Sequence, residues 1–240
     1  MCSFFEIVED NSIYPIIRDE IRGLDIGVVI NNVGMSYEYP ESFDKVEDNE
    51  KFLTQMIRCN VDSVANITQM VLPGEFHLFL ATSFVFFIII LDMIKKHRGL
   101  IINVSSISGR RPTPLLALYS GTKGFIDLFS RFVRTNDEFL FDGFFIQFRS
   151  LAAECAPRGV LVQSLCPGYV VSKLSGIRKA SLIAPTPEKF VLSALDRVTL
   201  PFTTGFWTHE LQVKKTNHGE YLQLFLLGSH RITSTRISFQ

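Results

Sequence analysis

Charge of one sign is what this sequence most plainly lacks. Its 240 residues include 24 Lys and Arg against 24 Asp and Glu, so the formal net charge is zero. A protein that binds nucleic acid or an acidic membrane surface through its overall field carries an excess of basic residues. We therefore expect no nucleic acid as a partner, and any ligand has to be argued from local groups of residues.

Metal-ligand spacing is absent as well. The four cysteines, Cys2, Cys59, Cys155 and Cys166, form no Cys-x-x-Cys pair, and the five histidines are scattered. Structural zinc sites draw their ligands from short, regular spacings. We expect no metal site, and we interpret the cysteines as ordinary thiols and the histidines as ordinary imidazoles.

The pattern of a cleavable leader is also missing. The first thirty residues mix Glu, Asp and Arg with apolar residues, whereas a signal peptide has a charged end followed by an apolar stretch. We therefore expect the chain to start inside a fold. With 47% hydrophobic residues in 240 positions, the composition favours one globular domain over two.

Apolar strands alternate with amphipathic helices along the chain. Apolar residues at helical spacing predict helices over residues 13–22, 61–72 and 119–133. Short apolar runs predict buried strands over residues 26–30, 100–104 and 160–165. Alternation of this kind indicates an α/β fold in which helices cover both faces of a parallel sheet.

Two phenylalanine-rich segments interrupt this alternation. Residues 75–92 and 132–148 together contain 11 of the 22 phenylalanines and are interpreted as insertions. The first holds a run of 14 residues, from Leu78 to Leu91, in which only Thr82 and Ser83 are polar, and this run is shorter than the roughly 20 residues that span a bilayer. It is either a segment that dips into a membrane or a Phe-rich insertion of unknown place in the fold.

The residues that indicate chemistry follow the second predicted strand. Ser106 ends that strand, and Tyr119-Ser-Gly-Thr-Lys123 opens the next helix thirteen residues later. Positions four apart share a helix face, so the Lys123 ammonium can lie beside the Tyr119 phenol. A nearby cation favours the phenolate, so we expect the pKa of Tyr119 to be lowered and the phenol to serve as a proton donor. The alternative is an exposed Tyr with a solvated Lys.

A second Tyr-x-x-x-Lys pair tests how specific this pattern is. Tyr169 and Lys173 have the same spacing, but they follow Pro167-Gly168 in a predicted loop. Ala156, thirteen residues before Tyr169, has no hydroxyl to polarise a carbonyl. We therefore interpret the second pair as a chance match.

The ordered motifs resemble those of short-chain dehydrogenases/reductases. They are Asn31-Asn32-Val33-Gly34, Asn60, Ser106, Tyr119-x-x-x-Lys123 and Pro167-Gly168. Further segments resemble the branch of 17β-hydroxysteroid dehydrogenases and very-long-chain 3-oxoacyl-CoA reductases, namely residues 34–40, 68–74 and 184–191. The resemblance implies a single-domain, Rossmann-type doubly wound parallel sheet over residues 1–212, with insertions at 75–92 and 132–148 and an unassigned tail at 213–240.

The resemblance also implies the catalytic roles. Tyr119 would be the general acid, Lys123 would bind the nicotinamide ribose and tune Tyr119, Ser106 would orient the substrate carbonyl, and Asn60 would hold a water of the proton relay. Without the family, Asn60 could be an amide on a helix surface.

The cofactor implied by the family is NADPH or NADP. Asn32 and Gly34 would line it beside Lys123, Pro167-Gly168 would let the backbone approach the nicotinamide, and Ser172 would bind its carboxamide. The alternative interpretations are a turn former for Asn32 and a plain loop hydroxyl for Ser172.

The sequence departs from the family at its beginning. A first strand and the loop T-G-x-x-x-G-x-G, which hold the cofactor pyrophosphate, do not precede Asn31. We therefore expect an incomplete sheet, an exposed edge at the strand before Asn31, and no reductase activity from these 240 residues alone. The insertion at 132–148 cuts the helix that commonly forms the subunit interface, so the usual homodimer is in doubt.

Two functions remain open. The first is an oxidoreductase that interconverts a ketone and a secondary alcohol on a steroid or a long-chain 3-oxoacyl-CoA. The family implies that it is located at the endoplasmic reticulum and associated with its membrane. The second is a catalytically inactive product, truncated or mis-spliced, without cofactor binding.

Overall fold

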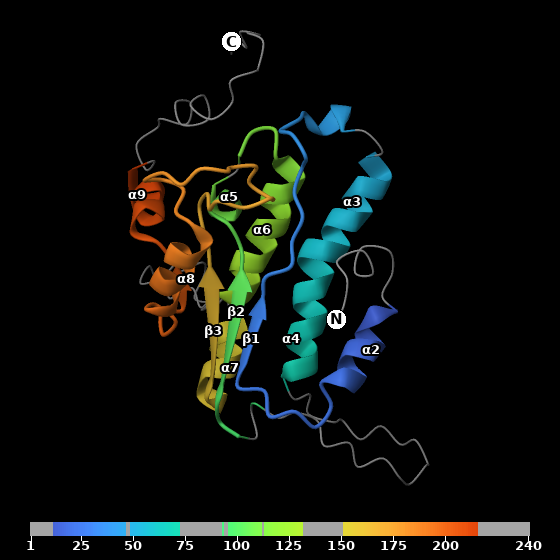
Figure 1. Ribbon diagram of the computed structural model, residues 1–240. Coiled ribbons are helices and arrows are strands. Elements are labelled where there is room, and N and C mark those ends of the chain that lie inside the picture. Colours follow the sequence, from blue (N-terminus) through green and yellow to red (C-terminus); the bar gives the residue numbers. More distant parts are fainter. Residues whose placement is uncertain are drawn as a thin grey trace, which may run out of the picture.

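Parallel strands and the helices between them account for most of the residues that the structure describes. The computed structural model describes residues 12–46, 49–72, 93, 96–111, 113–131 and 151–215. Its sheet contains β1 (Val28–Asn31), β2 (Gly99–Val104), β3 (Val160–Leu165) and β4 (Phe202–Thr203), hydrogen-bonded in that order and all parallel (Figure 1). The expected single α/β domain with a Rossmann-like parallel sheet is confirmed in this part of the chain.

Helices connect the strands and extend beyond β3. They are α2 (Ile13–Glu20), α3 (Asn49–Ile57), the π-turn η2 (Arg58–Asp62), α4 (Ser63–Val71), α5 (Ile107–Arg110), α6 (Ala117–Ser130), α7 (Leu151–Cys155), α8 (Pro187–Leu195) and α9 (Trp207–Lys215). Two short 3-10 turns, η1 (Phe43–Lys45) and η3 (Ala156–Arg158), lie between them. The predicted helices over 13–22 and 119–133 correspond to α2 and α6.

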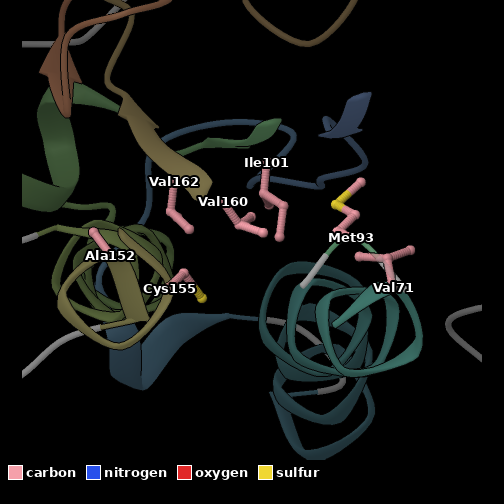
Figure 2. Packing of buried hydrophobic residues seen from close by; sticks show 7 residues of the cluster. All are labelled: Val71, Met93, Ile101, Ala152, Cys155, Val160 and Val162. Atoms are coloured by element: carbon pink, nitrogen blue, oxygen red, sulfur yellow. The ribbon is translucent and has the colours of Figure 1, made fainter. Parts of the chain in front are cut away.

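One face of the sheet carries the main core. Side chains alternate across a strand, so Ile101 of β2 and its neighbour Val162 of β3 point to the same side. Here they pack with Val71 of α4 and with Ala152 and Cys155 of α7 (Figure 2). Ile101 is completely buried, which is the burial expected for a central strand of a parallel sheet.

The opposite face is covered unevenly. Around β3, Leu165 packs with Ile102 and with Phe190 of α8. At β1, however, Val28 and Ile30 are 54% and 56% exposed. The prediction of a strand buried on both faces is therefore wrong for β1, because the described part of the chain supplies no helix over that face.

The helix before β2 begins earlier than its periodicity predicts. Residues 61–72 were expected to form one helix, whereas α3, η2 and α4 form a single continuous rod from Asn49 to Val71 (Figure 1). The π-turn in its middle adds a residue to one turn and shifts the helical phase. A pattern search at constant phase therefore finds only the second half.

Several predictions fall on residues outside the described ranges. The two expected insertions, 75–92 and 132–148, lie there, and so do residues 216–240 of the tail; residues 213–215 end α9. Among the helices of the described residues, none is long and apolar enough to cross a membrane. In the same ranges, no group of three or more His, Cys, Asp or Glu side chains is placed to hold a metal ion.

Candidate active site

The candidate site lies where the parallel strands end. The carboxyl ends of β1, β2 and β3 point in the same direction, so the segments that follow them meet at one edge of the sheet (Figure 1). These segments contain Gly34, Ser106 and Pro167. The helix α6, which carries Tyr119 and Lys123, packs against α5 and β3 beside them.

Ser106 and Tyr119 meet at this edge. Ser106 caps α5, and its hydroxyl accepts a hydrogen bond of 3.2 Å from the Ser108 backbone N–H. The pKa of Tyr119 is raised above its ordinary value by burial, and a hydrogen bond with the Ser106 side chain partly opposes this. A phenol with a raised pKa keeps its proton at neutral pH, so it can donate that proton to a second oxygen.

The direction of this pKa shift corrects one expectation. The Lys123 ammonium was expected to lower the pKa of Tyr119, but its Nζ lies 5.9 Å from the centre of the Tyr119 ring. The ammonium donates instead to the carbonyl oxygen of Val104, at 2.9 Å. Burial of the phenol, and not the cation, therefore sets the direction of the shift in its pKa.

Lys123 is buried, which excludes a solvated side chain. Only 3% of the residue is exposed, and this burial lowers its pKa to about 8, against smaller opposing effects of Cys59 and Cys166. A lysine that loses its proton this readily can exchange protons near neutral pH. Its ammonium donates to a backbone carbonyl and forms no ion pair with a carboxylate of the described residues.

Asn60 is completely buried, so it is not a helix-surface amide. Its Oδ1 accepts from the Met35 N–H at 2.8 Å, and its Nδ2 donates to the Met35 carbonyl at 3.0 Å and to the Thr122 hydroxyl at 2.9 Å. Both amide hydrogens are thus in use, while Oδ1 retains a second lone pair. A water held by the Asn60 side chain must therefore donate its hydrogen to Oδ1.

Gly34 leaves a cradle beside these groups. A Cβ added to Gly34 would lie 3.2 Å from Lys123 Nζ and 3.4 Å from Asn60 Oδ1. A side chain at this position would press on the ends of the Lys123 and Asn60 side chains, so glycine suits the close approach of the backbone after β1. Asn32, two residues earlier, is exposed at the same edge.

A close approach of α5 to α6 fixes the position of the Lys123 backbone. A Cβ added to Gly109 would lie 2.4 Å from the Lys123 carbonyl carbon. The Ser105 hydroxyl donates to the Lys123 carbonyl oxygen at 2.6 Å. The segment after β2 therefore holds the backbone of the candidate catalytic lysine from two sides.

We predict that Gly109→Ala destabilises the protein by about 2–3 kcal/mol, because the new methyl group must push α6 away. Urea unfolding of the variant measures this change. Gly121→Ala on the same helix is the matched control: a Cβ there meets no atom within 4 Å, so the variant should gain up to about 1 kcal/mol from its better helix propensity. Equal stability of Gly109→Ala and the unmodified protein would contradict the proposed constraint.

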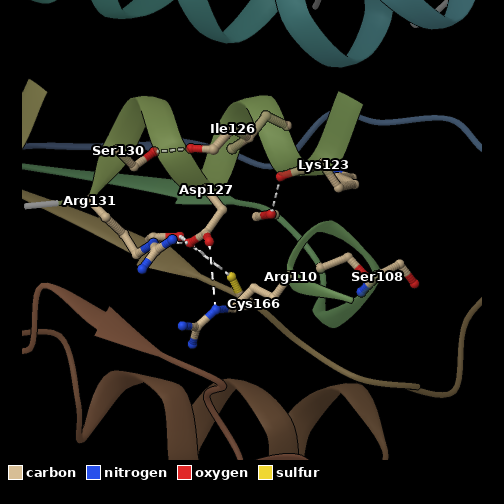
Figure 3. A network of polar contacts seen from close by, with 11 residues as sticks. Ser108, Arg110, Lys123, Ile126, Asp127, Ser130, Arg131 and Cys166 are labelled. Carbon is tan, nitrogen blue, oxygen red and sulfur yellow. Dashed lines mark hydrogen bonds and ion pairs between the residues drawn. The ribbon is translucent and has the colours of Figure 1, made fainter. Parts of the chain in front are cut away.

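A buried carboxylate connects α6 to the end of β3. Asp127 accepts a hydrogen bond of 2.6 Å from Ser164 and pairs with Arg131 at 2.8 Å and with Arg110 at 3.7 Å (Figure 3). The Cys166 thiol also donates to it, at 3.5 Å. Burial raises the pKa of this thiol to about 12, so it remains a neutral donor. The network holds α5, α6 and β3 in one arrangement.

A second buried network joins β1 to β2. Asn31 donates to Asn103 at 2.8 Å and to Thr68 at 3.2 Å, and Asn103 donates to Ser130 at 2.9 Å. Asn31 opens the motif Asn31-Asn32-Val33-Gly34, but no role was predicted for its side chain, nor for those of Asn103 and Asp127. Asn31 and Asn103 stand at the ends of neighbouring strands, where they are register partners.

The segment after β3 places the remaining predicted residues. Pro167 accepts a hydrogen bond of 3.0 Å from the Ile107 N–H, next to Ser106. Ser172 is exposed, and its hydroxyl bonds locally to Ser175, so the structure does not bring it to the other candidates. Tyr169 and Lys173 lie in a loop, as expected, although the charge of Tyr169 is close enough to raise the pKa of Tyr119 further.

Sequence comparisons agree with the motifs. The profile of the short chain dehydrogenase family matches residues 12–136. The very-long-chain 3-oxoacyl-CoA reductase of Homo sapiens is 40% identical over 200 residues, which are 83% of this chain and 53% of that protein. The chain thus spans about half the length of the relatives it matches. Nothing in these comparisons favours the alternative of an inactive product.

Solved structures share the fold. A 7β-hydroxysteroid dehydrogenase superposes with a TM-score of 0.60 at 19% identity, over 88% of this chain and 70% of its own. A short-chain dehydrogenase of Sphingobium yanoikuyae, solved in complex with NADPH, gives a TM-score of 0.55 at 15% identity, over 87% of this chain and 69% of its own. At these identities the likeness concerns the arrangement of strands and helices.

Proposed function

Because this chain belongs to the short chain dehydrogenase family, in the branch of the very-long-chain 3-oxoacyl-CoA reductases, we propose that it is an NADP(H)-dependent oxidoreductase that interconverts a ketone and a secondary alcohol. The observation that carries the proposal is the convergence of Ser106, Tyr119 and Lys123 at the carboxyl edge of the sheet. Tyr119 donates a proton, Ser106 orients the acceptor oxygen, and Lys123 is the buried cation behind them.

The residues present fit a nicotinamide cofactor. Gly34 leaves a cradle next to Lys123 Nζ, and the segment at Pro167-Gly168 borders the same edge. Lys123 would hold the ribose, with Asn32 and Gly34 along the cofactor; Ser172 would reach the carboxamide only if it gave up its bonds to Ser175. When bound, the cofactor supplies the hydride that the carbonyl carbon receives.

The protein's own groups supply the proton. As the carbonyl oxygen gains negative charge, the Tyr119 phenol transfers its proton to that oxygen while Ser106 hydrogen-bonds to it. Tyr119 then regains a proton from Lys123, whose pKa of about 8 permits release near neutral pH. A water that donates a hydrogen bond to Asn60 Oδ1 would connect Lys123 to solvent.

The substrate we propose is a long-chain 3-oxoacyl thioester, with a ketosteroid as the second choice. The loop after Tyr169 exposes large apolar side chains, with Leu174 at 53% and Leu182 at 69%, and the basic residues Lys173, Arg178 and Lys179 stand among them. Its ends are joined by a 3.1 Å hydrogen bond from the Val171 N–H to Pro185. An apolar wall suits an acyl chain, and basic residues suit the phosphates of CoA. Location at the endoplasmic reticulum, with its membrane, is proposed from the same branch resemblance.

Cofactor binding is the experiment that tests this proposal. Because the chain covers only 53% of the human relative's length, the protein as its gene encodes it should be purified and titrated with NADPH. We expect a change of NADPH fluorescence at micromolar cofactor and oxidation of NADPH when a 3-oxoacyl-CoA is added. No fluorescence change up to millimolar NADPH would overturn the proposal. Turnover of a 17-ketosteroid but not of a 3-oxoacyl-CoA would show that the substrate is a ketosteroid.

A further inference from the structure

His209, on α9, is a completely buried imidazole for which the proposed reaction has no use. Its ring packs against two phenylalanines, with centroids 5.8 Å from Phe190 and 5.6 Å from Phe206. Burial lowers the pKa of His209, and hydrogen bonding to the backbone of Tyr169, Thr204 and Ile183 only partly opposes this. The imidazole is therefore neutral at neutral pH and carries one N–H.

That single N–H is directed at the segment after β3. His209 Nε2 lies 3.0 Å from the carbonyl oxygen of Tyr169. A carbonyl can only accept, so Nε2 carries the hydrogen and donates. The contact fixes the tautomer of the ring and the position of the Tyr169 peptide at the same time.

The edge of the same ring contacts the preceding residue. A Cβ added to Gly168 would lie 2.8 Å from His209 Cδ2 and 3.1 Å from Cγ. Gly168 therefore lets the backbone lie directly on the imidazole, and any larger residue would separate them. His209 thus holds the segment both by a hydrogen bond and by packing.

The other side of the segment faces the candidate catalytic residues. Pro167 accepts from the Ile107 N–H at 3.0 Å, one residue after Ser106, and the Cys166 N–H donates to Thr203 of β4 at 2.8 Å. Pro167, Gly168 and Tyr169 consequently form a short bridge between the cap of α5 and the His209 ring. A movement at His209 would reach Ser106 through three residues of backbone.

We propose that His209 is a positioning residue, which holds the Pro167–Tyr169 backbone in the place where it borders Ser106 and the nicotinamide. The proposal rests on the proposed function. The proposed role requires two properties of the side chain at position 209. It must supply an N–H donor where Nε2 lies, and it must present a planar group against which Gly168 can lie. Glutamine can supply such a donor at similar reach, whereas phenylalanine keeps a ring and supplies none.

Two variants of the protein as its gene encodes it separate the donor from the ring. His209→Phe should raise the KM for NADPH about tenfold, or about 1.4 kcal/mol, with kcat changed by less than about threefold. His209→Gln should stay within about threefold of the unmodified KM. Rescue by glutamine is not expected of a residue that only fills the core. An unchanged KM in His209→Phe, or equal damage in His209→Gln, overturns the proposal.

Gly168→Ala approaches the same contact from the other partner. It should raise the KM for NADPH by a similar factor, because the methyl group meets the imidazole edge. Combined with His209→Ala, which removes that edge, Gly168→Ala should cost little more than His209→Ala alone, and the coupling energy of the double-mutant cycle measures this. Additive effects would show that the two residues act separately.

Hydrogen exchange distinguishes failure of this inference from failure of the proposed function. In His209→Phe, but not in His209→Gln, the amides of residues 168–171 should exchange about tenfold faster, whether or not NADPH is turned over. If the unmodified protein binds no NADPH and this difference is still present, the proposed function fails and the positioning of the segment stands. If exchange is the same in all three proteins, the positioning role is wrong.

Discussion

Tyr119→Phe is expected to lower kcat for ketone reduction by about a thousandfold while the affinity for NADPH changes by less than about twofold. The variant keeps the ring but loses the proton donor. Among the described residues, no other side chain near Ser106 could donate a proton from the same place. Single-turnover reduction of a 3-oxoacyl-CoA measures the loss, and NADPH fluorescence measures binding. Turnover unchanged within about threefold would remove Tyr119 from the role of acid.

Tyr169→Phe is the matched control for this experiment. Tyr169 is the other tyrosine of a Tyr-x-x-x-Lys pair, and its structural contact to His209 uses the backbone carbonyl, which the substitution preserves. We expect activity within about threefold of the unmodified protein. A loss of a hundredfold or more would mean that the chemistry had been assigned to the wrong pair.

Lys123→Met is expected to lower kcat/KM at least about a hundredfold and, at the same time, to stabilise the protein in the absence of cofactor. Burial lowers the pKa of Lys123 from 10.5 to about 8, which means that the charged form costs the folded state about 3 kcal/mol below pH 8. Methionine removes this cost but leaves the Val104 carbonyl without its donor, at about 1–2 kcal/mol. A net gain of about 1–2 kcal/mol at pH 7 follows.

The gain should depend on pH in a defined direction. Because the pKa of Lys123 is lower in the folded state than in the unfolded one, the unfolded chain binds more protons between pH 8 and 10.5. The stability of the unmodified protein therefore rises through this window and reduces the advantage of Lys123→Met. Urea unfolding at pH 7 and pH 10 measures it. Lys173→Met, at an exposed loop position, should show no such pH dependence; an equal gain at both pH values in Lys123→Met would contradict the argument.

Local patterns in the sequence predicted most of the sheet. Strands β2 and β3 follow from β-branched runs, and Tyr119 with Lys123 follows from helical spacing, because each signal lies within a few neighbouring residues. Strand β4 was not predicted, since two residues are too few to form a pattern. The exposure of Val28 and Ile30 could not be read from the run that contains them, because it depends on which segment packs over the sheet.

The polar interior of the site was beyond local patterns for the same reason. Asn31 and Asn103 are 72 residues apart and meet only because their strands are neighbours. His209 was interpreted as an ordinary imidazole, because its contact with Tyr169 joins residues 40 positions apart and leaves no local pattern. Residues that hold a site through tertiary contacts have no fixed spacing, whereas a Tyr and a Lys on one turn of helix do.

The π-turn at Arg58–Asp62 has a consequence for how this helix tolerates change in length. One residue of an α-helix corresponds to a rotation of about 100°, and the wide turn absorbs the extra residue, so α3 and α4 keep the faces that they present to their neighbours. Deleting one residue of this turn would restore ordinary helical winding, and both helices would still present the same faces. The deletion would instead move Asn60 out of the position in which its amide bonds to Met35. The extra residue is therefore tied to the placement of Asn60 and not to the packing of the helix faces.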